Sequence, residues 1–253
     1  MESHVTLLNR KSLRLAELAP KEESRYTLRA LSVTDKETVV TDGHLLVRVT
    51  HPKVDAGHFP TIPRFAAGKA FERVLLPVDA AKDIAKAIPT KTTIPILAHA
   101  ALAVTSDADG AHLSVAVTDL DTHRVFSPKA MSGQYPNWQA VMPHEVPVFA
   151  ISVDANLLLK LCKYVTEFKK DDNGPATVRM SFTGPQNAVR LDAVSKDTQQ
   201  GMTALLMPVR ADDKGADDKG EYAACWPLPV AVPVADPFAD VPEYVGEDAV
   251  AVA

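Results

Sequence analysis

The chain has 253 residues, 46% hydrophobic and 23% charged, a balance typical of a globular protein with one large or two smaller cores. Its net charge of −5 is uneven: residues 211–253 carry seven Asp, three Glu and two Lys, which leaves the rest of the chain at +3. An acidic total therefore does not exclude nucleic acid as a partner, because phosphate binding depends on where Lys and Arg cluster. No apolar stretch approaches membrane-spanning length, and we expect a cytoplasmic protein.

The two cysteines are far apart and have different surroundings. Cys162 lies within an apolar, helix-like pattern, and Cys225 lies in a Pro-rich stretch. Neither belongs to a CxxC pair, so the sequence shows neither a disulfide framework nor a redox or zinc motif. We expect no metal and no cofactor.

The first predicted element is a helix at residues 9–18, NRKSLRLAEL. Asn9 is a suitable N-cap, Leu15 and Leu18 fall on one face, and Pro20 ends the helix. The spacing gives the helix an apolar face for packing on a sheet.

Short antiparallel strands are predicted next. Residues 25–33 alternate between polar and apolar, residues 34–37 form a charged turn, and residues 38–50 are rich in β-branched side chains around Asp42 and Gly43. A period of two is typical of a strand with one buried face, and an Asp-Gly pair is typical of a hairpin turn.

The second block of sequence repeats this order. A strand at residues 72–78 leads to Asp79, the predicted N-cap of a helix at residues 80–88, and Pro89 ends that helix. An extended, Pro-bounded segment at residues 135–143 completes the block. Between them, strands are predicted at residues 94–105, 112–119 and 123–129, with a turn at residues 107–110.

The third block has the same order again. A strand at residues 148–153 leads to Asp154, the predicted N-cap of a helix at residues 155–168, and a polar loop follows. Further strands are predicted at residues 176–182, 188–195 and 201–209.

Three blocks of a helix followed by antiparallel strands, each about 70 residues long, indicate an internal repeat and an α+β fold. We expect a domain at residues 1–143, made of half-units at about 1–70 and 71–143, and a third half-unit at residues 144–210. Residues 211–253 contain a tandem ADDKG and are rich in Pro, Ala and acidic side chains, which is typical of a flexible tail.

Each predicted helix carries basic side chains away from its apolar face. If the half-units lie side by side, three cationic helix faces share one side of the molecule, and such a surface can follow a phosphate backbone without reading base sequence. Exposed helix faces commonly carry Lys, so an ordinary solvated surface is the alternative interpretation. The predicted DNA-binding residues are Arg10, Lys11, Arg14, Lys82, Lys86, Lys160 and Lys163.

The sequence contains no P-loop, no GxSxG and no Cys–His pair with an orienting group, so we do not expect an enzyme. The alternative is a metal-dependent enzyme that uses Asp119, Asp121 and His123. Alternation along a strand would split these side chains between two faces, and a turn accounts for the run more simply.

Three separated stretches carry a likeness to one known family. Residues 41–46 read TDGHLL, residues 135–143 read YPNWQAVMP, and residues 205–210 read LLMPVR. In this order they resemble the bacterial sliding clamp, the β subunit of DNA polymerase III, whose members show TDGHRLA, FPDYRRVLP and VMPMRL. The IPIL at residues 94–97 and the VTDL at residues 117–120 resemble a further clamp segment.

The resemblance implies a DNA-clamp-like fold: a ring around duplex DNA, with helices lining the hole and sheets outside. It implies a homo-oligomeric processivity factor in DNA replication, and the reduced length suggests a phage or mobile element. It also implies a hydrophobic groove for peptides of a DNA polymerase and the clamp loader. Carried over by position, this groove consists of Thr41, Gly43, His44, Leu46, Pro136, Val141, Leu205, Met207 and Pro208.

The sequence also departs from the clamp pattern. Bacterial clamps have three domains, each made of two half-units, whereas three half-units are predicted here. Leu45 and Ala140 stand where the family has Arg, which makes the rim of the groove less basic. Two functions remain open: a factor that encircles DNA, and a clamp-like interaction module that binds replication peptides without forming a ring.

Overall fold

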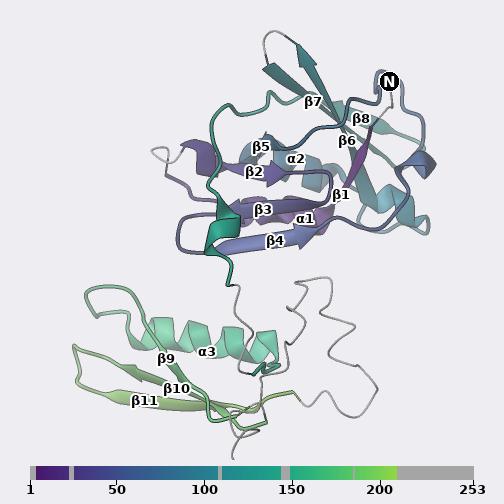
Figure 1. Cartoon of the computed structure of the whole chain (residues 1–253). Helices are drawn as coiled ribbons and strands as arrows, with labels where there is room; N and C mark the ends of the chain where they lie inside the picture. The colour runs from purple at the N-terminus through teal and green to yellow at the C-terminus, as the bar shows by residue number, and fades with distance from the viewer. Residues whose placement is uncertain (1–3, 23–25, 108–109, 144–148, 185, 210–253) are drawn as a thin grey trace, which may run out of the picture. The chain divides into compact units, whose positions relative to one another are not determined.

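The computed structural model describes residues 4–22, 26–107, 110–143, 149–184 and 186–209. The predicted tail at 211–253 lies outside these residues, as do residues 108 and 109 of the predicted turn. The chain divides into two compact units, Met1–Met142 (unit 1) and Pro143–Ala253 (unit 2), and each is described by itself. Both combine antiparallel sheets with few helices (Figure 1).

The first sheet of unit 1 has four antiparallel strands in the order β4-β3-β2-β5. β2 is buried along its whole length, because β3 pairs with one of its edges and β5 with the other. β5 comes later in the chain than the β3–β4 hairpin and forms the edge of the sheet beside β2. The strands are β2 (Ala30–Val33), β3 (Glu37–Thr41), β4 (Leu46–Thr50) and β5 (Val74–Pro77).

The second sheet of unit 1 has the order β1-β6-β7-β8 and is also antiparallel. β1 precedes the first sheet in the chain but pairs with β6, from Thr6 opposite Leu102 to Asn9 opposite His99. β1 thus belongs to the sheet of β6, β7 and β8, which come later in the chain. β5 in turn belongs to the sheet of β2, β3 and β4, which come earlier. The strands are β1 (Thr6–Asn9), β6 (His99–Asp107), β7 (Gly110–Thr118) and β8 (His123–Phe126).

Two helices of unit 1 pack on each other and share one hydrophobic core with both sheets. They are α1 (Arg10–Arg14), which continues as a 3₁₀ turn at Leu15–Leu18, and α2 (Val78–Ala87). Burial of each large apolar side chain in such a core contributes roughly 1.5–3 kcal/mol. Fully buried side chains of this core are Leu8, Leu13, Leu31, Leu76, Ile84 and Leu102.

Unit 2 contains one long helix, α3 (Ala155–Phe168), and a sheet in the order β11-β10-β9. Alternation along β10 buries Val189 and Leu191 between the sheet and the helix, where they meet the half-buried Leu158 and Leu161 of α3. The strands are β9 (Arg179–Ser181), β10 (Val189–Val194) and β11 (Gly201–Leu206). In the described part of the chain, no helix is long and apolar enough to cross a membrane.

Two of the predicted helix caps are confirmed. The Asn9 side chain accepts a hydrogen bond from the Ser12 backbone N–H at 2.9 Å. Asp154 accepts from Asn156 N–H at 2.7 Å and from Leu157 N–H at 3.3 Å. Such caps are local in sequence, which is why the pattern of residues was sufficient to predict them.

The prediction that Asp79 caps the second helix is wrong. β5 runs directly into α2, which begins at Val78 with Pro77 as the cap residue, so Asp79 lies inside the first turn. Its carboxylate instead pairs with Arg29 at 3.8 Å. The burial predicted for Leu18 is also wrong: the helix tightens to a 3₁₀ turn after Arg14, and Leu18 is 39% exposed.

Several predicted strands are shorter than expected. Residues 26–29 form a 3₁₀ turn before β2, and Pro95–Ala98 form another before β6. The extended segment at 135–143 contains a 3₁₀ turn at Trp138–Val141. Residues 149–153 form no strand, because none of the described residues offers them a ladder of backbone partners.

Candidate functional site

Four of the five predicted DNA-binding residues of unit 1 line one groove between α1 and α2. Arg10 and Arg14 of α1 and Lys82 and Lys86 of α2 line it together, with the apolar Leu13 between them. Helix α1 precedes the first sheet in the chain and α2 follows it, so packing of the two helices brings these cations together. Lys11 is also exposed on α1.

Acidic neighbours share this cationic surface. Arg14 lies 3.8 Å from Glu17, and Lys86 lies 3.0 Å from Asp83. Both pairs are exposed, and exposed pairs contribute about 0–1 kcal/mol, so a phosphate group can displace the carboxylates at little cost. The Arg10 guanidinium donates to the Ile88 carbonyl oxygen just beyond the end of α2, which fixes the position of its charge.

Unit 2 carries the other two predicted DNA-binding residues. Lys160 and Lys163 are exposed on α3, and so are the apolar side chains Leu157, Leu159 and Tyr164. The exposed surface of α3 is therefore partly cationic and partly hydrophobic.

The predicted peptide-groove residues of the TDGHLL stretch surround the β3–β4 turn. Asp42 accepts hydrogen bonds from His44 N–H at 2.7 Å and Leu45 N–H at 2.8 Å. These donors, Leu45 first, hold the pKa of the Asp42 carboxyl below its ordinary value. Gly43 has a φ of 94°, a left-handed conformation that favours glycine.

The side chain of the buried Thr41 also stabilises this turn. Its hydroxyl donates to the Leu45 carbonyl oxygen at 2.6 Å and accepts from Gly43 N–H at 3.1 Å. Gly43 and His44 are exposed at the tip, and Leu46 is half-buried at the start of β4. The turn is thus fixed by its own side chains, and it exposes the apolar Leu45 by 38%.

Segment 135–141 packs on this hairpin. The buried Tyr135 hydroxyl accepts a hydrogen bond from the Thr41 backbone N–H at 3.1 Å and lies 3.5 Å from the Val39 carbonyl oxygen. Burial raises the pKa of Tyr135 to about 12. The Arg48 guanidinium lies 5.9 Å from the centre of the Trp138 ring, so a cation–π contact joins the same two segments.

The structure therefore brings together two of the three stretches named in the sequence. Pro136 and Val141 project from this segment and are exposed, Val141 by 72%. Tyr135 and Trp138, which attach the segment, were absent from the predicted site. Two aromatic residues in a short, Pro-bounded stretch are the signal that could have identified them.

The third stretch lies in unit 2. Alternation along β11 buries Leu206 against α3 and turns Leu205 outward, where it is 65% exposed. Met207 is 64% exposed and Pro208 half-buried. The stretch is held within unit 2 by a hydrogen bond from Val209 N–H to the Ser152 carbonyl oxygen at 2.8 Å.

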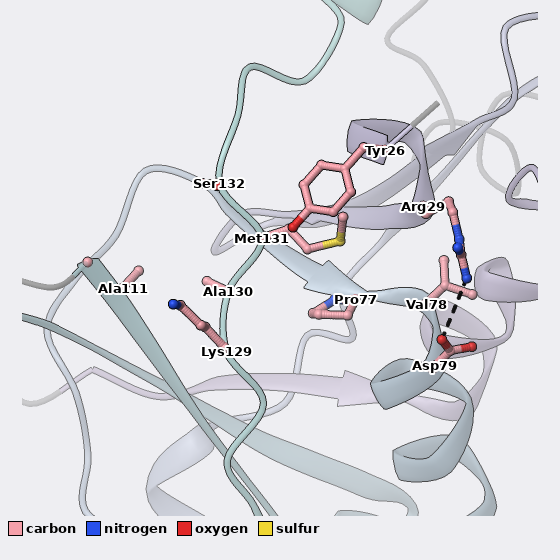
Figure 2. A pocket seen from close by; sticks show the side chains of 11 residues that line it. Tyr26, Arg29, Pro77, Val78, Asp79, Ala111, Lys129, Ala130, Met131 and Ser132 are labelled. Atoms are coloured by element: carbon pink, nitrogen blue, oxygen red, sulfur yellow. Dashed lines mark ion pairs between the residues drawn. The ribbon is translucent and has the colours of Figure 1, made fainter. Parts of the chain in front are cut away.

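A separate hollow of about 750 Å³ lies in unit 1 and contains none of the predicted site residues (Figure 2). The Arg29–Asp79 ion pair lies at one end of it, and Tyr26 and Lys129 line other parts. The lining has no pairing of a nucleophile with a general base, so it indicates no particular reaction.

The metal-site alternative finds no support in the described residues. Asp119 accepts from the Thr122 backbone N–H at 2.6 Å and from the Thr122 hydroxyl at 3.0 Å, which makes it part of a turn. The Thr122 backbone donor, followed by its hydroxyl, lowers the pKa of this carboxyl. Across the described ranges, no group of three or more His, Cys, Asp or Glu could hold a metal ion.

No family model matches the sequence, and no curated protein matches it. The fold does match a crystal structure described as a DNA polymerase III beta subunit from Eubacterium rectale ATCC 33656, with a TM-score of 0.54 and 12% sequence identity. The match covers 82% of this chain and 51% of that one, so this chain spans about half of the other's length. The fold is therefore similar to that of a DNA polymerase III beta subunit.

Proposed function

We propose that this protein is a sliding-clamp-type processivity factor, which holds duplex DNA without sequence specificity and tethers a DNA polymerase. The observation that carries the proposal is the groove between α1 and α2, where Arg10, Arg14, Lys82 and Lys86 converge from two distant parts of the chain. Cations on a rigid helix pair can follow phosphates without reading base edges. The fold similarity to a DNA polymerase III beta subunit supports the same function.

The order of elements supports the half-unit organisation that the proposal requires. In unit 1, the order of one strand, one helix and three antiparallel strands occurs from β1 to β4 and again from β5 to β8. In unit 2, residues 149–153, α3 and β9 to β11 follow the same order without the first strand being formed. We propose half-units at about 1–70, 71–143 and 144–210.

The polymerase-binding residues of this proposal lie in the three sequence stretches, two of them in unit 1 and one in unit 2. Its support in unit 1 is the packing of the 135–141 segment on the β3–β4 hairpin, which leaves Val141 exposed. Its support in unit 2 is the pair of exposed apolar side chains Leu205 and Met207. Exposed apolar side chains of this kind suit a short hydrophobic peptide of a polymerase or loader.

Charge reversal tests the DNA-binding part of the proposal. We expect replacement of Lys82, Lys86, Lys160 and Lys163 by Glu to weaken binding to a DNA duplex, measured by fluorescence anisotropy over a salt series. Each lost phosphate contact should reduce the slope of log K against log salt by about 0.9. All four side chains are exposed, so the fold should be unaffected.

The matched control places Glu at Lys21, Lys36, Lys53 and Lys91, which are exposed and lie outside the helices. These four substitutions change the net charge by the same amount, and we expect a smaller loss and an unchanged slope. Equal losses in the control and in the helix variant would show that the cationic helices do not contact DNA.

The second candidate function is a clamp-like module that binds replication peptides without encircling DNA. The favouring observation is that the hairpin and the 135–141 segment are assembled within unit 1 alone. Peptide binding together with an absence of retention on circular DNA would select this function over the first.

A further inference from the structure

Unit 2 exposes an unusual number of large apolar side chains for its size. On α3 and beside β9, Leu159 is 52% exposed, Phe182 45% and Met180 39%. Phe149, 40% exposed, lies 6.2 Å from Phe182 between ring centres. These side chains flank one edge of the sheet and one face of the helix, and both regions differ from their counterparts in unit 1.

The open edge of β9 is the first difference. In unit 1, β2 follows the 3₁₀ turn after the helix, and its outer edge is covered by β5, from Ala30 opposite Pro77 to Val33 opposite Val74. β6 is covered in the same way by β1. β9 has the place of β2 in the order of unit 2, and no strand among the described residues pairs with its outer edge.

Met180 shows that the core is open at this edge. It pairs with Leu191, a fully buried residue that faces α3, and directly opposed residues share one face of a sheet. Met180 therefore points to the helix side of the sheet, yet it is 39% exposed. A strand paired with the outer edge of β9 and a helix packed on the same face of the sheet would bury Met180.

The segment before α3 is the second difference. β1 and β5 each run directly into a helix, and each has three buried residues, Thr6–Leu8 and Val74–Leu76. Residues 151–153 run into the Asp154 cap of α3 in the same way but are only half-buried and form no strand. In unit 2, residues 151–153 therefore resemble a strand that pairs with no sheet. The outer edge of β9 is a sheet edge with which no strand among the described residues pairs.

The free face of α3 is the third difference. Counting from the cap residue, Arg14 of α1, Lys82 of α2 and Leu159 of α3 are in the same position. Arg14 and Lys82 line the groove where α1 and α2 meet. The same position on α3 carries an exposed leucine, and within the described part of unit 2 no second helix packs there.

We propose that unit 2 is half of a domain that a second copy of this chain completes. In this dimer, residues 151–154 of each copy add a strand to the β9 edge of the other, and the two α3 helices pack at Leu159. The proposal rests on the half-unit organisation proposed above. A second copy is the fitting occupant because the unpaired segment and the open edge belong to the same unit, which is the self-complementarity of a two-fold contact.

The dimer would contain two copies of unit 1 and one shared domain formed by the two copies of unit 2. The alternative occupant is the chain's own segment 210–253, in which case the full chain would be monomeric.

Sedimentation velocity of the full-length protein without DNA tests the proposal. We expect a dimer at concentrations up to about 100 µM, where a dimer with a Kd of about 1 µM is nearly complete. Leu159→Glu and Met180→Lys should each convert it to a monomer, because both side chains are exposed and a Lys on an edge strand opposes strand addition. Val194→Glu is the matched control: Val194 is 56% exposed on the opposite face of the sheet, and its variant should remain dimeric.

A cross-linking measurement keeps the test independent of variant folding. In a Cys225→Ser chain, the half-buried Cys162 lies on the same face of α3 as Leu159, and a short bis-maleimide should join two chains through it. A wild-type monomer, a dimer that survives both substitutions, or a dimer that does not cross-link would each overturn the proposal. Because no DNA is present, a failure of DNA binding leaves this result unaffected.

Discussion

At the scale of single residues, Tyr135 connects the candidate site to the core. Its hydroxyl lies between the Thr41 N–H and the Val39 carbonyl oxygen, so one buried side chain attaches the 135–141 segment to β3. The exposed Pro136 and Val141 depend on this attachment for their position. Tyr135 is therefore a positioning residue for the proposed groove.

Tyr135→Phe removes the hydroxyl and leaves the Thr41 N–H buried without this partner. We expect the free energy of unfolding to fall by about 1–3 kcal/mol, measured by urea denaturation at neutral pH. Tyr26→Phe is the matched control, because Tyr26 is 58% exposed and its hydroxyl carries no such role. An unchanged urea midpoint for Tyr135→Phe would show that the Tyr135 hydroxyl does not attach the 135–141 segment to β3.

The pH dependence of stability provides a second measurement on the same variant. Tyr135 has a pKa of about 12 in the folded state, above the value of about 10 expected in the unfolded chain. The folded state thus holds the proton more tightly, and this contribution to stability is complete below pH 10 and lost between about pH 10 and 12. The wild type should lose more stability than Tyr135→Phe over that range.

Local residue patterns were sufficient for the features that depend on neighbours in the chain. Asn9 and Asp154 were recognised as caps because a cap bonds to a backbone two or three residues ahead. Asp79 is not the cap, because Pro77, the last residue of β5, is already the cap residue of α2. The boundary between β5 and α2 depends on the pairing of β5 with β2, which local residue patterns do not show.

At the scale of elements, long-range pairing accounts for what the sequence could not predict. The helices at residues 78–87 and 155–168 and the β3–β4 hairpin were predicted nearly to their ends. β1 was missed because four residues before a helix carry no periodic signal, and its partner β6 is far away in the chain. Residues 149–153 have the apolar character of a strand, but no strand of the described structure pairs with them.

The proposed peptide-binding residues lie in both units, so the test removes one apolar side chain from each. We expect a fluorescent peptide from a polymerase tail to bind the wild type in an anisotropy titration. Leu46→Ala combined with Met207→Ala should abolish that binding, because truncation of the anchors of a small apolar site removes most of its binding energy.

The control for this titration is Leu120→Ala with Val194→Ala, which removes exposed apolar side chains outside the three stretches. This variant should bind the peptide as the wild type does. Equal binding by the groove variant and the wild type would show that Leu46 and Met207 do not form the site.

At the scale of the whole molecule, the likeness to a clamp is one of fold, and the chain spans about half of the matched subunit. It covers 51% of that subunit and resembles it at 12% identity, so neither its assembly nor its partners can be taken from the match. A composite domain formed by two copies of unit 2 offers a way for short chains to build a larger assembly. The exposed surfaces of α3 and β9, which motivated it, become visible only in the folded structure.

We propose that this protein holds duplex DNA by encircling it, and retention on circular DNA tests this proposal most directly. We would load the full-length protein on a nicked circular duplex and on the same duplex linearised, then wash both at high salt and measure bound protein. Salt removes contacts to phosphates but does not release a closed ring. Retention on the circle with loss from the linear form is the predicted result. Equal loss from both forms, in a preparation shown to be oligomeric, would contradict the claim.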